Sequence, residues 1–169
     1  GAQDHPIITA AVMKGLLASV SSDTVTYVNA LILAEERGIA ITQTRQGRHP
    51  HFGDLITVSV KTEGSTRVVA GTVFEGIGAK IVLIDGVMLN ADPAGHLLIV
   101  YNDDKPGVVG MLGTVLEQHH VNIAGIFLGR QHTGGRAVSV LNVDSEVPSE
   151  AIVEMQRDPR VAEAVPVKL

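Results

Sequence analysis

The sequence lacks several residue types, and each absence excludes a class of protein. Cysteine and tryptophan are absent, and aromatic residues make up only 3% of the 169 positions. A chain without cysteine has no disulfides, thiolate metal sites, iron–sulfur clusters or cysteine nucleophiles. No apolar run approaches the roughly 18–20 residues that a membrane span needs, and no secretory signal pattern is visible.

Charge is also sparse, and it shows no bias towards nucleic acid. Charged residues make up 18% of the chain, the net charge is −5, and no basic stripe is present. Neither nucleic acid nor a membrane surface is therefore an expected partner. Apolar residues, at 45%, are sufficient for a packed core. We expect a soluble, cytoplasmic protein with two small domains.

The first half predicts a small mixed α/β domain. Asn29 and Gly38 stand where a helix would begin and end. Glu63-Gly64-Ser65 and Asp85-Gly86 are turn signals between apolar stretches. The expected elements are a helix over 6–20, a strand over 24–28, a helix over 29–37, a strand over 39–44, and two hairpins, 54–62 with 66–74 and 80–84 with 87–90.

The second half predicts a complete βαββαβ unit, which is the ferredoxin-like plan of an antiparallel sheet with two helices on one face. The expected elements are strands over 96–102, 121–131, 136–143 and 160–168, and helices over 107–119 and 148–157. Asp92-Pro93-Ala94-Gly95 is the best linker candidate. It predicts domains at 1–94 and 95–169, an α+β architecture overall, and a hinge between the two.

The segment between the first strand and first helix of this unit predicts a small-molecule site. Asn102-Asp103-Asp104-Lys105 is followed by Pro106-Gly107, and proline suits the first turn of a helix. The free N–H groups of that turn can bind a small carboxylate. Ordinary capping of the helix by Asp103 or Asp104 is the alternative interpretation.

Several motifs together resemble the regulatory half of the long-form D-3-phosphoglycerate dehydrogenase family. The motifs are TAAVMKGLL (9–17), YVNALILAEERGI (27–39), GTVFEG (71–76), KIVLIDG (80–86) and the DKPG stretch at 104–107. Residues 1–94 resemble the intervening, or allosteric-substrate-binding, domain of that family, and residues 95–169 resemble its ACT domain. The resemblance implies feedback control of serine biosynthesis with L-serine as effector.

The resemblance also implies which residues bind the effector. The family's positions fall on Asn102, Asp104 and Asn122. Asp104 suits the ammonium of an amino acid, and the two asparagines suit its carboxylate and hydroxyl. The N–H groups of Gly107, Val108 and Val109 are further carboxylate donors.

A second anion site is a weaker candidate in the first half. Lys80 falls where the family can place an anion-binding lysine, and Arg45 and Arg48 lie in a basic loop with His49 and His51. Solvated surface charge is the alternative for this group. The seven histidines show no metal-ligand spacing, so no metal site is expected.

Nothing in the sequence predicts catalysis by this chain. The dinucleotide fingerprint G-x-G-x-x-G after a strand is missing. The glycines at 107, 110 and 113 are expected to serve packing inside a helix. NAD is implied for the parent enzyme only. Two alternatives remain: the regulatory part of an L-serine dehydratase, and a free-standing ACT-type amino-acid sensor.

The ACT domains are expected to pair as a homodimer, with a tetramer as a further option. The glycine-rich helix face permits close approach of a second copy. We also expect strand 97–101 to be an apolar edge that pairing would cover.

Overall fold

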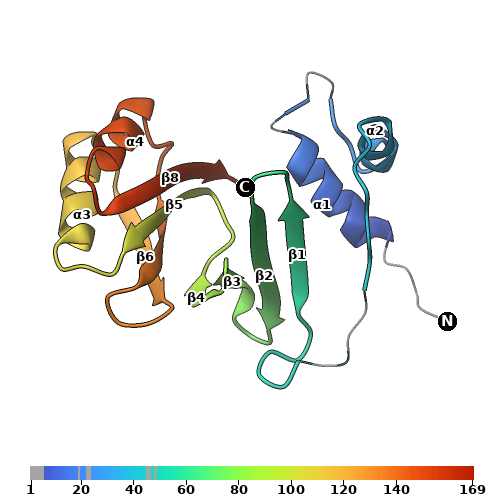
Figure 1. Cartoon of the computed structure of the whole chain (residues 1–169), viewed down its shortest axis with the longest axis horizontal. Helices are drawn as coiled ribbons and strands as arrows, with labels where there is room; N and C mark the ends of the chain where they lie inside the picture. The colour runs from blue at the N-terminus through green and yellow to red at the C-terminus, as the bar shows by residue number, and fades with distance from the viewer. Residues whose placement is uncertain (1–5, 19, 22–23, 45–46, 48) are drawn as a thin grey trace. The chain divides into compact units, whose positions relative to one another are not determined.

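The computed structural model describes residues 6–18, 20–21, 24–44, 47 and 49–169. The chain divides into two compact units, residues 1–47 and 48–169. Helices and antiparallel sheets are both present (Figure 1), which confirms the α+β class. No helix in the described part of the chain is long and apolar enough to cross a membrane.

The first unit contains two helices that pack on each other. Helix α1 spans Pro6–Ala18 and helix α2 spans Ala30–Glu36. Leu17 of α1 is buried together with Ala30 and Ala34 of α2, which lie one turn apart and allow close contact. Gly38 has a positive φ of 68°. The helix therefore ends at the predicted glycine.

Both strands predicted in this unit are wrong. Over 24–28 the side chain of Asn29 accepts a hydrogen bond from the Thr26 amide at 2.7 Å and donates one to the Thr24 carbonyl at 3.0 Å. These bonds form a turn in place of a strand, because asparagine side chains compete for backbone partners. Residues 39–44 belong to no sheet in the described chain, although Ile39 packs against the helices.

The second unit begins with an antiparallel sheet in the order β1-β2-β3-β4. Its strands are Ile56–Lys61, Thr66–Phe74, Gly78–Ile84 and Val87–Ala91. The two predicted hairpins are confirmed. Asp85 and Gly86 both have positive φ, 47° and 82°, as the two central residues of a type I′ turn require.

The βαββαβ unit follows as predicted. Strand β5 (His96–Asp103) leads into helix α3 (Val108–Gln118), strands β6 (Ile123–Arg130) and β7 (Arg136–Val143), helix α4 (Ser149–Gln156) and strand β8 (Val161–Lys168). The sheet order is β6-β7-β5-β8, the ferredoxin-like arrangement. Strand β5 therefore lies in the middle of the sheet, paired with β7 and β8, and its prediction as an edge is wrong.

The central strands of the second sheet, β5 and β7, are covered on both faces. Figure 1 shows α3 and α4 together on one side of this sheet, where Leu98 and Val100 pack against Leu112 and Met155. On the other face, residues of β5 and β7 pack against β3 and β4; this second core contains Leu97, Val138, Val140, Ile84, Val87 and Ala91. The two sheets of this unit therefore form a single packed body.

The segment predicted to be a hinge is fixed to that body. The Asn142 side-chain amide donates to the Asp92 carbonyl at 3.0 Å and the Ala94 carbonyl at 3.3 Å. The Leu169 amide donates to the Gly95 carbonyl at 2.9 Å. These bonds and the apolar core between the two sheets hold the sheets together, so residues 92–95 do not act as a hinge between them. The domain boundary at 94/95 stays a prediction.

Candidate functional site

The loop between β5 and α3 is held from two sides by its backbone. The Asp103 amide donates to the Arg160 carbonyl, which lies just before β8, at 2.8 Å. The Asp104 amide donates to the Gly135 carbonyl in the β6–β7 turn, also at 2.8 Å. The Arg160 guanidinium adds a bond from Nη1 to the Pro106 carbonyl at 2.9 Å. The loop is therefore fixed before any ligand binds.

Gly107 lies at the point where the loop becomes helix α3. Its φ is +86°, in the left-handed region that favours glycine, and it precedes the helix. A Cβ there would lie 3.1 Å from Arg160 Nη1. The prediction that all three glycines lie inside a helix is wrong for Gly107, which stands at the helix start. Gly110 and Gly113 do lie within α3, and a Cβ at either would meet nothing within 4 Å in the single chain.

Asp104 does not cap the helix. Its Oδ2 accepts hydrogen bonds from Arg130 Nη1 at 2.8 Å and from the Gly134 amide at 2.9 Å. The Gly134 amide, followed by the Arg130 guanidinium, lowers the pKa of Asp104 below its ordinary value. This carboxylate is therefore an anion at neutral pH and is oriented by the β6–β7 turn.

The first turn of α3 has no side-chain cap. Asp103 pairs with Lys105 Nζ at 2.8 Å, and neither aspartate bonds to the helix start. Helices normally have unpaired N–H groups in this turn, here including those of Val108 and Val109. The capping alternative is therefore not what the structure shows, and an anion-binding helix start remains.

Asn102 is buried and already engaged. Only 7% of it is exposed. Its Oδ1 accepts from Ser139 Oγ at 2.9 Å, and its Nδ2 donates to the Asp103 carbonyl at 2.7 Å. In this arrangement Asn102 supports the loop from beneath, and its role in binding the effector stays a prediction.

Asn122 lies at the opposite end of the sheet from Asp104. It precedes β6, whose first residue Ile123 pairs with Val143, which in turn pairs with His96 at the start of β5. The eight residues of β5 span roughly 25 Å at about 3.3 Å per residue. Asn122 Nδ2 bonds to Asp144 at 2.6 Å. One chain therefore does not bring the two predicted effector residues together.

The second predicted anion site is not assembled in the described residues. The Lys80 ammonium pairs with the Asp92 carboxylate, and the lysine side chain is 13% exposed. Its charge is therefore already neutralised. Arg45 and Arg48 lie outside the described residues.

A polar cluster that the sequence did not predict lies between the two sheets. Arg67 of β2 pairs with Asp85 at 3.0 Å and with Glu163 of β8, and its guanidinium lies 4.5 Å from the centroid of the Tyr101 ring. Burial, followed by the hydrogen bond with Asp85, raises the pKa of Tyr101 to about 12. No local pattern could reveal this cluster, because its members come from three separate strands and a turn.

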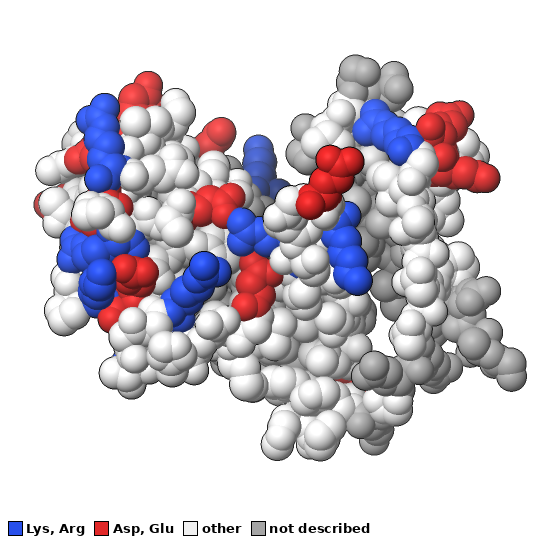
Figure 2. All heavy atoms as spheres, viewed as in Figure 1, with Lys and Arg blue, Asp and Glu red and all other residues white. Residues whose placement is uncertain are grey.

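In the described part of the chain, the histidines form no metal site and the surface charges form no large basic patch on the face shown in Figure 2. Among the described residues, no three metal-binding side chains lie close enough to hold an ion. His119 Nε2 lies 3.2 Å from a Glu154 carboxylate oxygen, an ordinary surface contact. On the face shown in Figure 2, Lys and Arg side chains lie among Asp and Glu, and no large basic area forms there.

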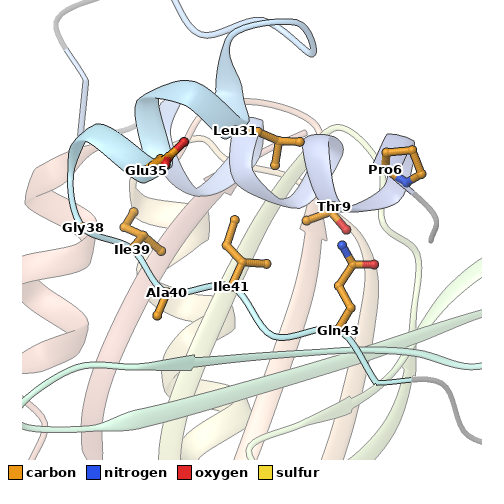
Figure 3. A pocket seen from close by; sticks show the side chains of 9 residues that line it. All are labelled: Pro6, Thr9, Leu31, Glu35, Gly38, Ile39, Ala40, Ile41 and Gln43. Carbon is orange, nitrogen blue, oxygen red and sulfur yellow. The ribbon is translucent and has the colours of Figure 1, made fainter. Parts of the chain in front are cut away.

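The first unit has an open groove of its own. It has a volume of about 560 Å³ and lies between α1, α2 and residues 38–43. Figure 3 shows that Leu31, Ile39 and Ile41 line it together with the polar groups of Thr9, Glu35 and Gln43. Of the described residues that line it, Glu35 alone carries a charge.

The fold thus defines a ferredoxin-like βαββαβ domain, a class that also serves many unrelated functions. Sequence comparison narrows the class, since the ACT domain family matches residues 96–159 and the D-3-phosphoglycerate dehydrogenase intervening domain matches residues 1–85. The chain belongs to this intervening-domain family and carries an ACT domain. It fits the C-terminal regulatory region of such dehydrogenases.

Relatives named D-3-phosphoglycerate dehydrogenase match nearly the whole chain. The protein of Archaeoglobus fulgidus is 35% identical over 164 residues, covering 96% of this chain and 31% of the relative. That of Bacillus subtilis is 33% identical over 162 residues, with 96% and 30% covered. That of Mycobacterium tuberculosis is 32% identical over 151 residues, with 88% and 29% covered. The chain therefore spans under a third of the length of these relatives.

Proposed function

We propose that this chain is a cytoplasmic amino-acid-sensing module that binds L-serine and mediates feedback control of an NAD-dependent D-3-phosphoglycerate dehydrogenase. The observation that supports it most directly is the loop at 103–107. There the ionised Asp104 stands beside a helix start without a side-chain cap. An α-amino acid offers the matching groups, an ammonium for the carboxylate and a carboxylate for the helix N–H groups.

The proposal includes a homodimer that completes the site. Asn122 and Asp104 lie at opposite ends of one sheet, and β6 is an edge strand that pairs only with β7 within the described chain. A twofold contact that places two β6 strands antiparallel brings the start of each against the end of the other. Asn122 of one copy then approaches Asp104 of the other.

The surface beside this edge supports a second copy as its occupant. Ile126 and Leu128 of β6 are 39% and 53% exposed on the face that carries the helices. Gly110 and Gly113 of α3 leave open space around their Cβ positions. Apolar edges of this kind are normally covered in native proteins.

Calorimetry with L-serine, glycine and L-alanine tests the function. We expect L-serine to bind with a Kd of roughly 1 μM to 1 mM, the range of ordinary metabolites. Asp104→Ala removes a charged hydrogen-bond partner and should weaken binding about 10- to 100-fold. An absence of heat and of any thermal shift with all three amino acids at about 10 mM, above that range, would contradict the proposal.

Mixing two variants tests the shared site. Asp104→Ala and Asn122→Ala are each expected to bind poorly as homodimers. In an equimolar mixture about half of the dimers are mixed, and each mixed dimer has one intact site of two. The mixture should therefore recover about a quarter of the sites. A site contained within one chain would recover nothing on mixing, and sedimentation that shows only monomers would exclude the dimer.

A further inference from the structure

Among the described residues, three cationic side chains bond to the loop that carries Asp104, and their other partners differ. Lys105 pairs with Asp103. Arg160 is committed by Nε and Nη2 to Asp158, at 2.8 and 2.6 Å, and by Nη1 to the Pro106 carbonyl. Both therefore serve the loop itself.

Arg130 is placed differently. It is the last residue of β6, its side chain is 53% exposed, and it donates from Nη1 to Asp104 at 2.8 Å. A guanidinium carries five N–H donors in a planar fork and binds carboxylates in two-point fashion. About half of the side chain thus faces solvent beside the loop.

The Asp104–Arg130 pair places one negative and one positive charge side by side. An α-amino acid also carries two adjacent charges, an ammonium that can pair with Asp104 and a carboxylate that can pair with Arg130. Asp104 does not depend on Arg130 for its orientation, because the Gly134 amide also holds it at 2.9 Å. Arg130 can therefore turn towards a ligand while the aspartate stays in place.

We propose that Arg130 binds the α-carboxylate of the effector together with the N–H groups of the helix start, while Asp104 binds its ammonium, so that the Asp104–Arg130 ion pair is the resting form of the effector site. This rests on the proposed function and deepens it. The site then selects zwitterionic α-amino acids and discriminates against amines that lack a carboxylate. Arg130 is a specificity-determining residue that belongs to the edge strand β6.

Calorimetry with two probes, L-serine and L-serinamide, separates the two charges. The full chain should bind L-serine at least about tenfold more tightly than L-serinamide, the effect of one charged hydrogen-bonding partner. Arg130→Gln should remove most of the preference for L-serine over L-serinamide, and leave L-serinamide binding within about twofold. Arg130→Lys, which keeps the charge and loses the fork, should lie between the two.

Arg136→Gln is the matched control. Arg136 is an exposed residue of the same hairpin. Arg130 is the register partner of Ala137, the residue next to Arg136, and successive strand residues point to opposite faces. Arg136 therefore lies on the opposite face of the sheet from Arg130. Arg136→Gln changes the net charge by the same amount as Arg130→Gln, and it should leave the affinities for L-serine and L-serinamide unchanged.

Each outcome decides a separate question. If wild type binds none of the amino acids, the proposed function is wrong and this inference falls with it. If wild type binds L-serine and Arg130→Gln binds it equally well or more tightly, Arg130 is a competitor for Asp104 and only this inference is overturned. Equal losses for both probes would assign Arg130 a purely structural role and would also overturn it. Should Arg130→Gln fail to fold, Arg130→Lys and the wild-type preference between the probes carry the same decision.

Discussion

The two faces of the β5–β8 sheet are covered by different means at its central strands. On the helix face, Leu98 and Val100 meet Leu112 and Met155 in an apolar core, and the buried polar residues Asn102 and Ser139 are uncharged and bond to each other. On the sheet face, the apolar core is bordered by a cluster of ionisable groups, in which Arg67 joins Asp85 and Glu163 beside Tyr101.

The difference shows that the two faces have separate tasks. The helix face joins elements that follow one another along the chain, and its buried residues are apolar or, like Asn102 and Ser139, uncharged. The sheet face joins β1–β4 to the βαββαβ domain, and here the arrangement of paired charges adds orientation to non-directional apolar contact. The helix face maintains the domain, and the other face fixes its attachment.

The largest expected effect is on the helix face. Leu112 is fully buried at 0% exposure, and Leu112→Ala should lower the free energy of unfolding by about 2–5 kcal/mol, from lost burial and the cavity left behind. Denaturant unfolding measures the change. Val109→Ala, at a 44% exposed position of the same helix, should change it by no more than about 0.5 kcal/mol. Similar effects at both positions would contradict the assignment of this core.

A smaller effect is expected where β4 crosses β6. A Cβ on Gly129 would lie 2.2 Å from the Met88 carbonyl oxygen and 2.5 Å from Val87 Cγ1. Gly129→Val should therefore force the sheets apart and cost about 1–3 kcal/mol. Leu128→Val, at an exposed neighbour on the other face, serves as the control. A Gly129→Val protein as stable as wild type would show that this face does not pack as described.

The polar border of the sheet face predicts a pH effect. An unfolded tyrosine has a pKa of about 10, and burial with the Asp85 hydrogen bond raises that of Tyr101 to about 12. The folded state keeps the proton longer, so this contribution to stability is complete below about pH 10 and is lost as the pH rises towards 12. Tyr101→Phe should remove that part of the alkaline loss.

Phenolate absorbance measures the same group directly. The titration is best performed with Tyr27→Phe, since Tyr27 and Tyr101 are the two tyrosines of the chain. Asp85→Asn removes the nearby negative charge and replaces a charged hydrogen-bond acceptor by a neutral one, so it should lower the pKa of Tyr101. An unchanged titration in Asp85→Asn would mean that the cluster does not form in solution.

The smallest effect concerns two glycines at the start of α3. A Cβ at Gly110 meets nothing within 4 Å, and Gly110→Ala should stabilise the helix by about 0.4–1 kcal/mol. Gly107→Ala should destabilise, because φ is +86° and Arg160 Nη1 lies 3.1 Å from the new Cβ. Thermal unfolding of dilute protein compares the two. Changes of the same sign would contradict the described helix start.

Sequence periodicity was most reliable where burial and local pattern agree. The βαββαβ order and both hairpins follow from turn residues such as Asp85-Gly86 and from the apolar spacing of α3. The strands expected at 24–28 and 39–44 failed for a different reason. A strand needs a neighbouring strand to pair with its backbone groups, and the fold decides whether that neighbour exists. At 24–28 the Asn29 side chain bonds to the backbone of Thr24 and Thr26 instead.

The central position of β5 in the sheet does have a signal in the sequence. Its run of apolar residues, Leu97–Val100, is typical of a strand that is covered on both faces. As an edge strand it would have been expected to carry a polar face. The strand order β6-β7-β5-β8 puts it between two neighbours.

The candidate site was only half predictable. The position of Asp104 before a helix follows from the sequence, but its bonds to Arg130 and Gly134 link residues that are distant along the chain. The separation of Asn122 from Asp104 is equally invisible locally, because it depends on β6 running parallel to β5 two strands away.

By itself the sequence determined the α+β class, the βαββαβ order, the turns and the loop at 103–107, since each depends on local propensity and periodicity. Only the tertiary structure decided that β5 is central, that 92–95 is fixed, that Asp104 meets Arg130, and that Asn122 lies at the far end. The physical reason is that strand order and ion pairing depend on which distant segments bury the same apolar surface, and no local pattern encodes that choice.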